Sequence, residues 1–148
     1  MKELQEKIFS TFSSVASSLG YSEVHGRIIS ALLMTGKPMS LDEISVMTRY
    51  SPASISISLD LLEMVGIIKR VKKQGDRKLY VKLHGDLLEG LRNALLFKLQ
   101  KEIMRTLDEL SVLKKDEASA KAVKSVETEI KRLEEYVGRL SKVPVPER

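Results

Sequence analysis

The chain contains no cysteine, and it has no long hydrophobic run. The absence of cysteine excludes disulfide bonds, thiolate metal sites and cysteine nucleophiles, and it fits a reducing compartment. No apolar stretch approaches the roughly 20 residues that a membrane-spanning helix needs. The N-terminal segment MKELQEKIFSTF is charged and amphipathic, unlike an export signal. We therefore expect a cytoplasmic protein with no membrane partner.

The side-chain sets that enzymes and metal proteins use are also missing. The two histidines, His25 and His84, have no carboxylate or second histidine at ligand spacing, so we expect ordinary packing or surface roles for them. Asp60 and Glu63 form a pair of carboxylates on one predicted helix, where solvation is the expected state. No nucleophile with a nearby base and no phosphate-binding loop is present. The sequence predicts a protein that is not an enzyme and holds no metal or cofactor.

Positive charge is in excess, and one segment holds most of it. The 148 residues carry 25 Lys and Arg against 20 Asp and Glu, a net charge of +5 that mildly favours polyanionic partners. Residues 67–83 contain a single acid, Asp76, against seven basic residues: Lys69, Arg70, Lys72, Lys73, Arg77, Lys78 and Lys82. Lysines on an exposed strand deter aggregation, but seven basic residues exceed that need. The segment therefore favours nucleic-acid binding.

Hydrophobic spacing indicates helices on both sides of a central domain. Residues 1–21 form an N-terminal helix that we assign to a dimer interface, with a stripe at spacings of four and three. The stripe consists of Leu4, Ile8, Phe12, Val15 and Leu19. Residues 85–142 form long helices for dimerisation, broken near residues 114–116. Residues 143–148, with two prolines, form a tail.

The central domain, residues 22–84, reads as a helix-turn-helix followed by a hairpin. Ser40 and Glu43 form a capping box that opens a short helix over 41–49. Ser51 caps the second helix, in which Pro52 occupies the first turn. Strands over 67–71 and 79–83 flank a turn at Gly75-Asp76. The fold class is thus mainly α with a small β-hairpin, a winged helix-turn-helix domain plus long helices for dimerisation.

The second helix begins with small polar residues, as a helix that enters the major groove must. Serine hydroxyls can bond to bases or phosphates, and small apolar groups can contact thymine methyls. The candidate major-groove residues are Pro52, Ala53, Ser54, Ser56, Ile57 and Ser58. The candidate backbone and wing contacts are Arg49, Ser51, Lys72, Lys73, Arg77 and Lys78, with Arg77 in the minor groove. The alternative is a solvated helix face in a protein-binding domain.

The segment SPASISISLDLLEMVGIIKRVKKQGDRKLY resembles the MarR superfamily, and most closely its GbsR-type branch. The matching residues are Ser51, Ser56, Leu59, Leu62, Gly66, Gly75, Arg77, Lys78 and Tyr80. Two features depart from the family: Pro52-Ala53 replace a common lysine and small residue, and Asp76 and Arg77 are adjacent. The resemblance implies a dimeric transcriptional regulator of double-stranded operator DNA. It also implies an unknown small-molecule effector, held between the winged domain and the long helices.

The last long helix has apolar residues at spacings of three and four, which is a strict heptad seam. We predict homodimerisation through this seam and the preceding helix. The candidate dimerisation residues are Leu95, Leu99, Ile103, Val123, Val126, Ile130, Leu133, Val137 and Leu140. An antiparallel helix pair within one chain is the alternative, although it would leave a stripe uncovered. For the whole protein, the alternatives to a regulator are a winged-helix protein-interaction module and a non-specific nucleic-acid or chromatin binder.

Overall fold

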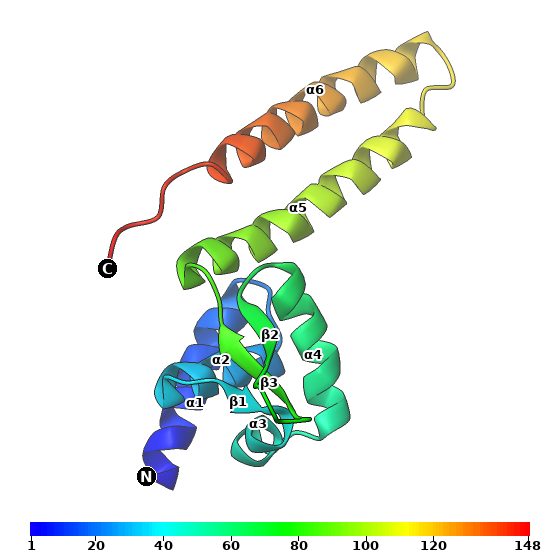
Figure 1. Ribbon diagram of the computed structural model, residues 1–148. Helices are drawn as coiled ribbons and strands as arrows, with labels where there is room; N and C mark the ends of the chain where they lie inside the picture. Colours follow the sequence, from blue (N-terminus) through cyan, green and yellow to red (C-terminus); the bar gives the residue numbers. More distant parts are fainter. The chain divides into compact units, whose positions relative to one another are not determined.

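The computed structural model describes all 148 residues and divides into two compact units, Met1–Leu91 and Arg92–Arg148. The predicted fold class is confirmed, since the chain is mainly helical with one small antiparallel sheet (Figure 1). No helix is both long and apolar enough to cross a membrane. The elements are α1 (Lys2–Ser18), α2 (Glu23–Thr35), β1 (Met39–Ser40), α3 (Leu41–Thr48), α4 (Pro52–Met64), β2 (Ile68–Lys72), β3 (Leu79–Leu83), α5 (Leu87–Ser111) and α6 (Glu117–Leu140).

The ends of the helices follow the capping residues that the sequence contains. The Ser40 hydroxyl accepts a hydrogen bond from the Glu43 amide at 3.2 Å, and the Glu43 carboxylate accepts one from the Ser40 amide at 2.9 Å, which completes the predicted capping box of α3. The Ser51 hydroxyl accepts from the Ser54 amide at 3.2 Å and begins α4, as expected. Arg49 ends α3 with a φ of 64°, a left-handed conformation that is uncommon for a residue with a side chain. This residue makes the sharp turn between α3 and α4.

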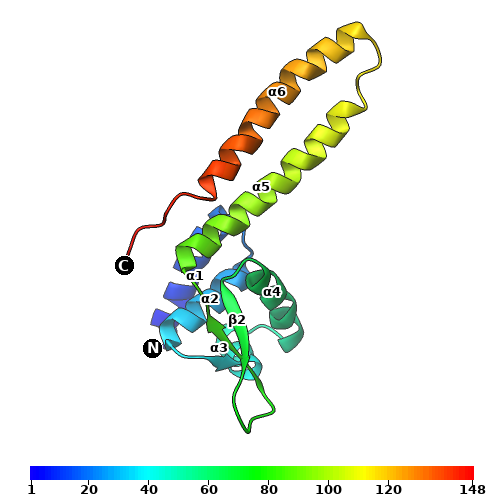
Figure 2. The same cartoon turned by 45° about the horizontal axis from the view of Figure 1, so that its top comes forward.

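The sheet has three strands in the order β1-β3-β2, one more than the predicted hairpin. All neighbours are antiparallel, and Arg70 of β2 lies opposite Val81 of β3, which in turn lies opposite Met39 of β1. The two-residue strand β1 is too short to show an alternating pattern, which explains why periodicity did not reveal it. The turn between β2 and β3 uses Gly75 at a φ of 78°. Figure 2 shows this turn projecting away from the helices of the first unit.

The hydrophobic core of the first unit lies between α1, α2, α3, α4 and the sheet. Ile55, Leu59 and Leu62 of α4 are buried, and the sheet contributes side chains from its inner face. The largest fully buried side chains there are Phe9, Ile28, Ile29, Leu32, Ile44, Ile55, Leu59, Leu62, Ile67, Ile68 and Val81. This core fixes both α4 and the base of the wing on one rigid support.

Helix α1 packs against α2 on a face other than the predicted stripe. Phe9, Ser13 and Ala16 are buried, whereas Leu4 and Val15 of the stripe are exposed. The cause is a close crossing: a Cβ at Gly26 of α2 would lie 2.8 Å from the Ser13 Cα. Small residues therefore select the buried face. Ile8, Phe12 and Leu19 of the apolar stripe are half-buried, so only Leu4 and Val15 remain open within the first unit.

In the second unit α5 and α6 run antiparallel, so the helix pair within one chain is present (Figure 1). Its core contains Leu96, Ile103 and Val137, with Leu99, Leu107, Ile130 and Leu140 packed against it. Lys114 in the connecting turn pairs with the buried Glu127 of α6 at 2.9 Å. The predicted seam residues of α6 therefore fall into two groups. Val123, Ile130 and Val137 pack toward α5 within the same chain. Two seam residues, Val126 and Leu133, are 48% and 37% exposed, and Leu95 of α5 is exposed as well.

Candidate nucleic-acid interface

The N-terminal half of α4 presents small side chains on an open face. Pro52, Ala53 and Ser56 are exposed, Ser54 is half-buried, and Ile57 is 73% exposed. No long side chain stands among them, so a flat or grooved surface can approach the helix backbone closely.

Ser58 departs from the predicted set. The structure places it on the inner side of α4, where it is only 9% exposed. Its hydroxyl donates to the Ser54 carbonyl oxygen at 3.0 Å, a bond within the same helix. Its neighbours Leu59 and Ile55 are buried, because the helical period turns position 58 toward the core. Ser58 is therefore unsuited to a direct base contact.

The wing tip, residues 72–78, is held by Asp76 and Tyr80. The Asp76 carboxylate accepts hydrogen bonds from the Lys78 amide at 2.9 Å and from the Tyr80 hydroxyl at 2.8 Å. These two bonds lower the pKa of Asp76 below its usual value, and the bond from the Lys78 amide has the larger effect. The Lys73 ammonium lies 4.0 Å from the centre of the Tyr80 ring, a cation–π contact. The one acid of the wing thus organises the turn.

Four cations remain available at this tip. Lys72, Lys73, Arg77 and Lys78 are all exposed, and none of them forms a salt bridge. Arg49, which precedes α4, is exposed too. The predicted backbone-contacting cations therefore lie on the surface, and none of them is held in a salt bridge.

Arg70 of β2 joins the wing strand to α4. Its guanidinium donates to Glu63 at 2.9 Å and to Asp60 at 2.8 Å, and its backbone N–H donates to the second Glu63 oxygen at 3.1 Å. A weaker bond reaches the Ser56 carbonyl oxygen at 3.5 Å. Both carboxylates are exposed, as expected for a solvated pair, but they also share one arginine, which was not expected. Sequence spacing gave no signal of this, since the partners are separated by seven and ten residues across a turn.

Arg27 of α2 supports the turn between α3 and α4 from behind. It forms salt bridges with Glu6 at 3.3 Å and with Glu23 at 3.1 Å. Its guanidinium also lies 6.0 Å from the centre of the Tyr50 ring, in the turn. The Tyr50 carbonyl oxygen accepts a hydrogen bond from the Ser45 hydroxyl at 2.5 Å. These contacts fix the angle at which α4 leaves the turn.

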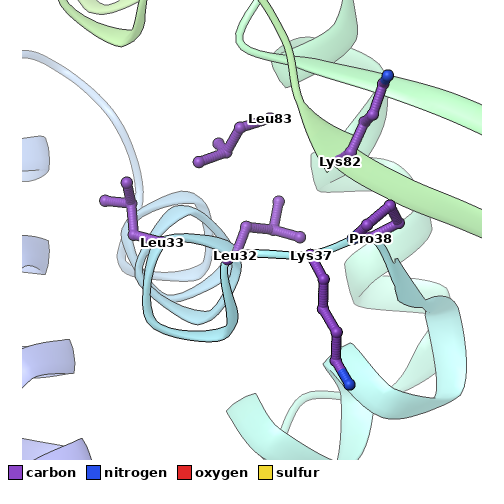
Figure 3. Close-up of a pocket in the computed structure, with 7 residues that line it drawn as sticks. Leu32, Leu33, Lys37, Pro38, Lys82 and Leu83 are labelled. Carbon is purple, nitrogen blue, oxygen red and sulfur yellow. The ribbon is translucent and has the colours of Figure 1, made fainter.

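A pocket of about 300 Å³ lies behind the wing, where α2 ends and β3 passes. Figure 3 shows Leu32, Leu33 and Leu83 around the hollow, with Lys37 and Lys82 at its rim. Gly36 and Pro38 complete the lining. The hollow between the leucines is apolar, the nitrogen ends of Lys37 and Lys82 point away from it in Figure 3, and no acidic residue lines it.

No protein-family model matches the chain, and no curated protein matches it either. Among solved structures, a protein described as a transcriptional regulator is similar over 94% of this chain and 99% of its own, with a TM-score of 0.64 and 20% identity. NadR in complex with 4-hydroxyphenylacetate is similar over 96% of this chain and 89% of its own, with a TM-score of 0.48 and 19% identity. A mutant of S. aureus MepR bound to an oligodeoxyribonucleotide also has a TM-score of 0.48, with 14% identity, over 86% of this chain and 90% of its own. The first likeness shows that the chain shares the fold of a transcriptional regulator.

Proposed function

We propose that this chain is a sequence-specific regulator of transcription that binds double-stranded DNA as a homodimer. One observation carries the proposal: the small-residue face of α4 is exposed in the same compact unit as a wing tip with four exposed cations that form no salt bridge. A slim polar helix suits the major groove, and cations on a projecting loop suit the phosphate backbone. The regulator fold found among solved structures agrees with this assignment.

The contacts divide by chemistry. Ser54 and Ser56 supply hydroxyls to base edges or phosphates, and Ile57 supplies an apolar surface for a thymine methyl. Pro52 and Ala53 allow the backbone to come close. The Ala53 N–H in the first turn of α4 suits a phosphate oxygen, since the Ser54 N–H is already bonded to the Ser51 hydroxyl. Backbone contacts come from Arg49 and Ser51 beside α4 and from the cations of the wing tip, with Arg77 in the minor groove.

Dimerisation follows from apolar surface that one chain leaves open. Val126 and Leu133 form the uncovered column of α6, and Leu95 is exposed on α5. Leu4 and Val15 of the α1 stripe are further apolar side chains that stay exposed in their own unit. A twofold dimer would place two α4 helices about 34 Å apart, one turn of DNA, so that each reads a half-site.

The residues shared with the MarR superfamily add support, and those shared with its GbsR-type branch suggest that subgroup. Of these residues, Ser51 caps α4, Gly75 makes the wing turn and Tyr80 fastens it, so the likeness falls on positions with a clear structural role. We therefore propose a MarR-type regulator.

A small-molecule effector belongs to the same proposal. The pocket behind the wing would suit a small apolar molecule, because leucines form its floor and no acidic residue lines it. Metabolites of this kind should change the affinity of the protein for its DNA. Leu33→Trp, which fills the pocket, should remove that response and leave DNA binding itself intact. A response that survives Leu33→Trp would place the effector elsewhere.

The experiment that tests the function is selection of duplexes from a random pool by the purified protein. We expect a twofold-symmetric motif whose half-sites are about 10 base pairs apart from centre to centre. Mass measurement in solution should give twice the chain mass. Binding of random and selected duplexes with equal affinity would favour a non-specific binder. A folded chain that ignores duplex DNA at low salt would favour a protein-interaction module.

A further inference from the structure

The groove-facing side of α4 carries a negative charge that a DNA-binding helix should not expose. Asp60 lies one helical turn after Ser56, about 6 Å further along the axis, on the same open face. Glu63 is exposed as well and lies next to the base of the wing. If α4 enters a groove, free carboxylates at these positions would face the phosphates on either side, and this repulsion is strongly unfavourable.

We propose that Arg70 is a positioning residue of the DNA-binding surface, which holds Asp60 and Glu63 in ion pairs and so halves their combined negative charge where α4 approaches DNA. The inference rests on the proposed function and adds a residue that acts on DNA binding without touching DNA. Of the seven cations between residues 67 and 83, Arg70 therefore binds carboxylates of its own chain and not DNA.

The geometry separates Arg70 from the cations of the wing tip. Its side chain is 22% exposed, and both terminal nitrogens are already engaged by carboxylates at normal hydrogen-bond distances. The backbone N–H of the same residue holds Glu63 from a second direction. Arginine suits this role because its planar fork meets two carboxylates at once, which a lysine ammonium does with less geometric definition. The Arg70 guanidinium therefore has few free N–H donors for a phosphate.

The test measures the affinity and its salt dependence for a fluorescent duplex selected by the wild-type protein. Arg70→Ala frees two carboxylates in each protomer, and we expect the Kd to rise on the order of 100-fold because like charges are brought together at the interface. The plot of log Kd against log salt should keep its slope, because no phosphate contact is lost. Arg77→Ala is the matched loss of one arginine, and it should make the slope shallower by about 2 per dimer.

A rescue experiment shows whether Arg70→Ala weakens DNA binding through the freed charges or through a change in the shape of the surface. Adding Asp60→Asn and Glu63→Gln to Arg70→Ala removes the freed charges without rebuilding the ion pairs, and it should recover most of the lost affinity. The same two acid substitutions with Arg70 intact should leave binding at least as tight as in the wild type. Thermal unfolding of each variant confirms that it is folded, and the variant with Arg70 intact carries the test if Arg70→Ala does not fold.

Three results would overturn the inference. A shallower slope for Arg70→Ala would mean that Arg70 contacts phosphate directly. A folded triple variant as weak as Arg70→Ala, or weakened binding by the two acid substitutions alone, would mean that the ion pairs matter for shape and not for charge. If the wild-type protein selects no duplex at all, the proposed function fails first and this inference fails with it.

Discussion

Arg77 and Lys82 are both exposed cations of the same hairpin, but only Arg77 lies at the projecting tip. Arg77→Ala should weaken binding to the selected duplex by roughly tenfold, within the range of about 1–3 kcal/mol for loss of a specific contact. Lys82→Ala removes the same charge from the middle of β3, and we expect less than a threefold effect. Fluorescence anisotropy at one fixed salt concentration measures both. Equal losses of DNA affinity in the two variants would show that only the total charge of the wing matters for binding and that Arg77 makes no specific contact.

Tyr21 gives the stability of the first unit a distinctive dependence on pH. Its buried hydroxyl donates to the Gly90 carbonyl oxygen at 3.1 Å, and burial raises the pKa of Tyr21 from 10.0 to about 12. A raised pKa in the folded state means that stability is fully present below pH 10 and is lost as the pH rises toward 12. The full loss is on the order of 2 to 3 kcal/mol.

Urea denaturation at pH 9.5 and pH 11.5 tests this, with Tyr21→Phe as the control. Phenylalanine cannot ionise, so the variant should lose less stability across this interval than the wild type, while the lysines titrate alike in both proteins. Parallel losses would mean that the Tyr21 hydroxyl ionises as easily in the folded chain as in the unfolded one.

The residues of the candidate interface could be predicted from sequence only where local chemistry determines them. Ser51, Gly75 and the tip cations follow from capping, turn and charge rules, and the structure has the cap, the turn and the exposed charges. Ser58 was misplaced because serine is common on both sides of a helix. The ion pairs of Arg70 could not be predicted, since they depend on how β2 docks beside α4 in three dimensions.

At the scale of elements, the face that α1 buries is set by a close contact and not by hydrophobic spacing. Gly26→Ala would place a methyl group 2.8 Å from the Ser13 Cα, which belongs to the backbone and cannot turn aside. We expect a loss of about 1–3 kcal/mol in the free energy of unfolding, as for other overpacked cores. The matched control is Gly138→Ala in α6, where a Cβ meets nothing within 4 Å.

That control should be neutral or stabilising by up to about 1 kcal/mol, because alanine favours a helix more than glycine does. Chemical denaturation of the two variants measures the contrast. If Gly26→Ala is as stable as Gly138→Ala, then α1 and α2 are less closely packed than the structure has them. The same contact explains why periodicity alone could not show which face of α1 packs on α2: small residues carry no hydrophobic signal, yet they decide where two helices approach.

The heptad seam of α6 shows a second limit of one-dimensional patterns. Spacing correctly indicated a long amphipathic helix, but it could not say that one chain would cover Val137 completely and leave Val126 half open. We predict that Val126→Glu with Leu133→Glu converts the dimer to a monomer, because each change places a charge in the column proposed for the partner. Light scattering after size exclusion measures the mass, and circular dichroism should show unchanged helix content.

Thr128→Glu adds the same charge at an exposed position of α6 outside the seam, and it should remain dimeric. The monomeric variant should also bind the selected duplex at least 100-fold more weakly, since a single winged helix engages only one half-site. A double variant that stays dimeric would move the interface to other surfaces, such as the stripe of α1.

For the whole molecule, the number of cations that meet phosphate can be read from the effect of salt. Each protomer presents four exposed cations without a salt bridge at its wing tip, Lys72, Lys73, Arg77 and Lys78, so a dimer presents eight. Each contact releases about 0.9 of a counterion, so the wing tips alone should give log affinity a slope of about −7 against log salt, and Arg49 would steepen it further. Anisotropy titrations at several salt concentrations give this slope directly. A slope near zero would remove the wing from the interface. A slope of about half the expected value would mean that only one wing of the dimer grips the duplex, and that the two protomers bind DNA unequally.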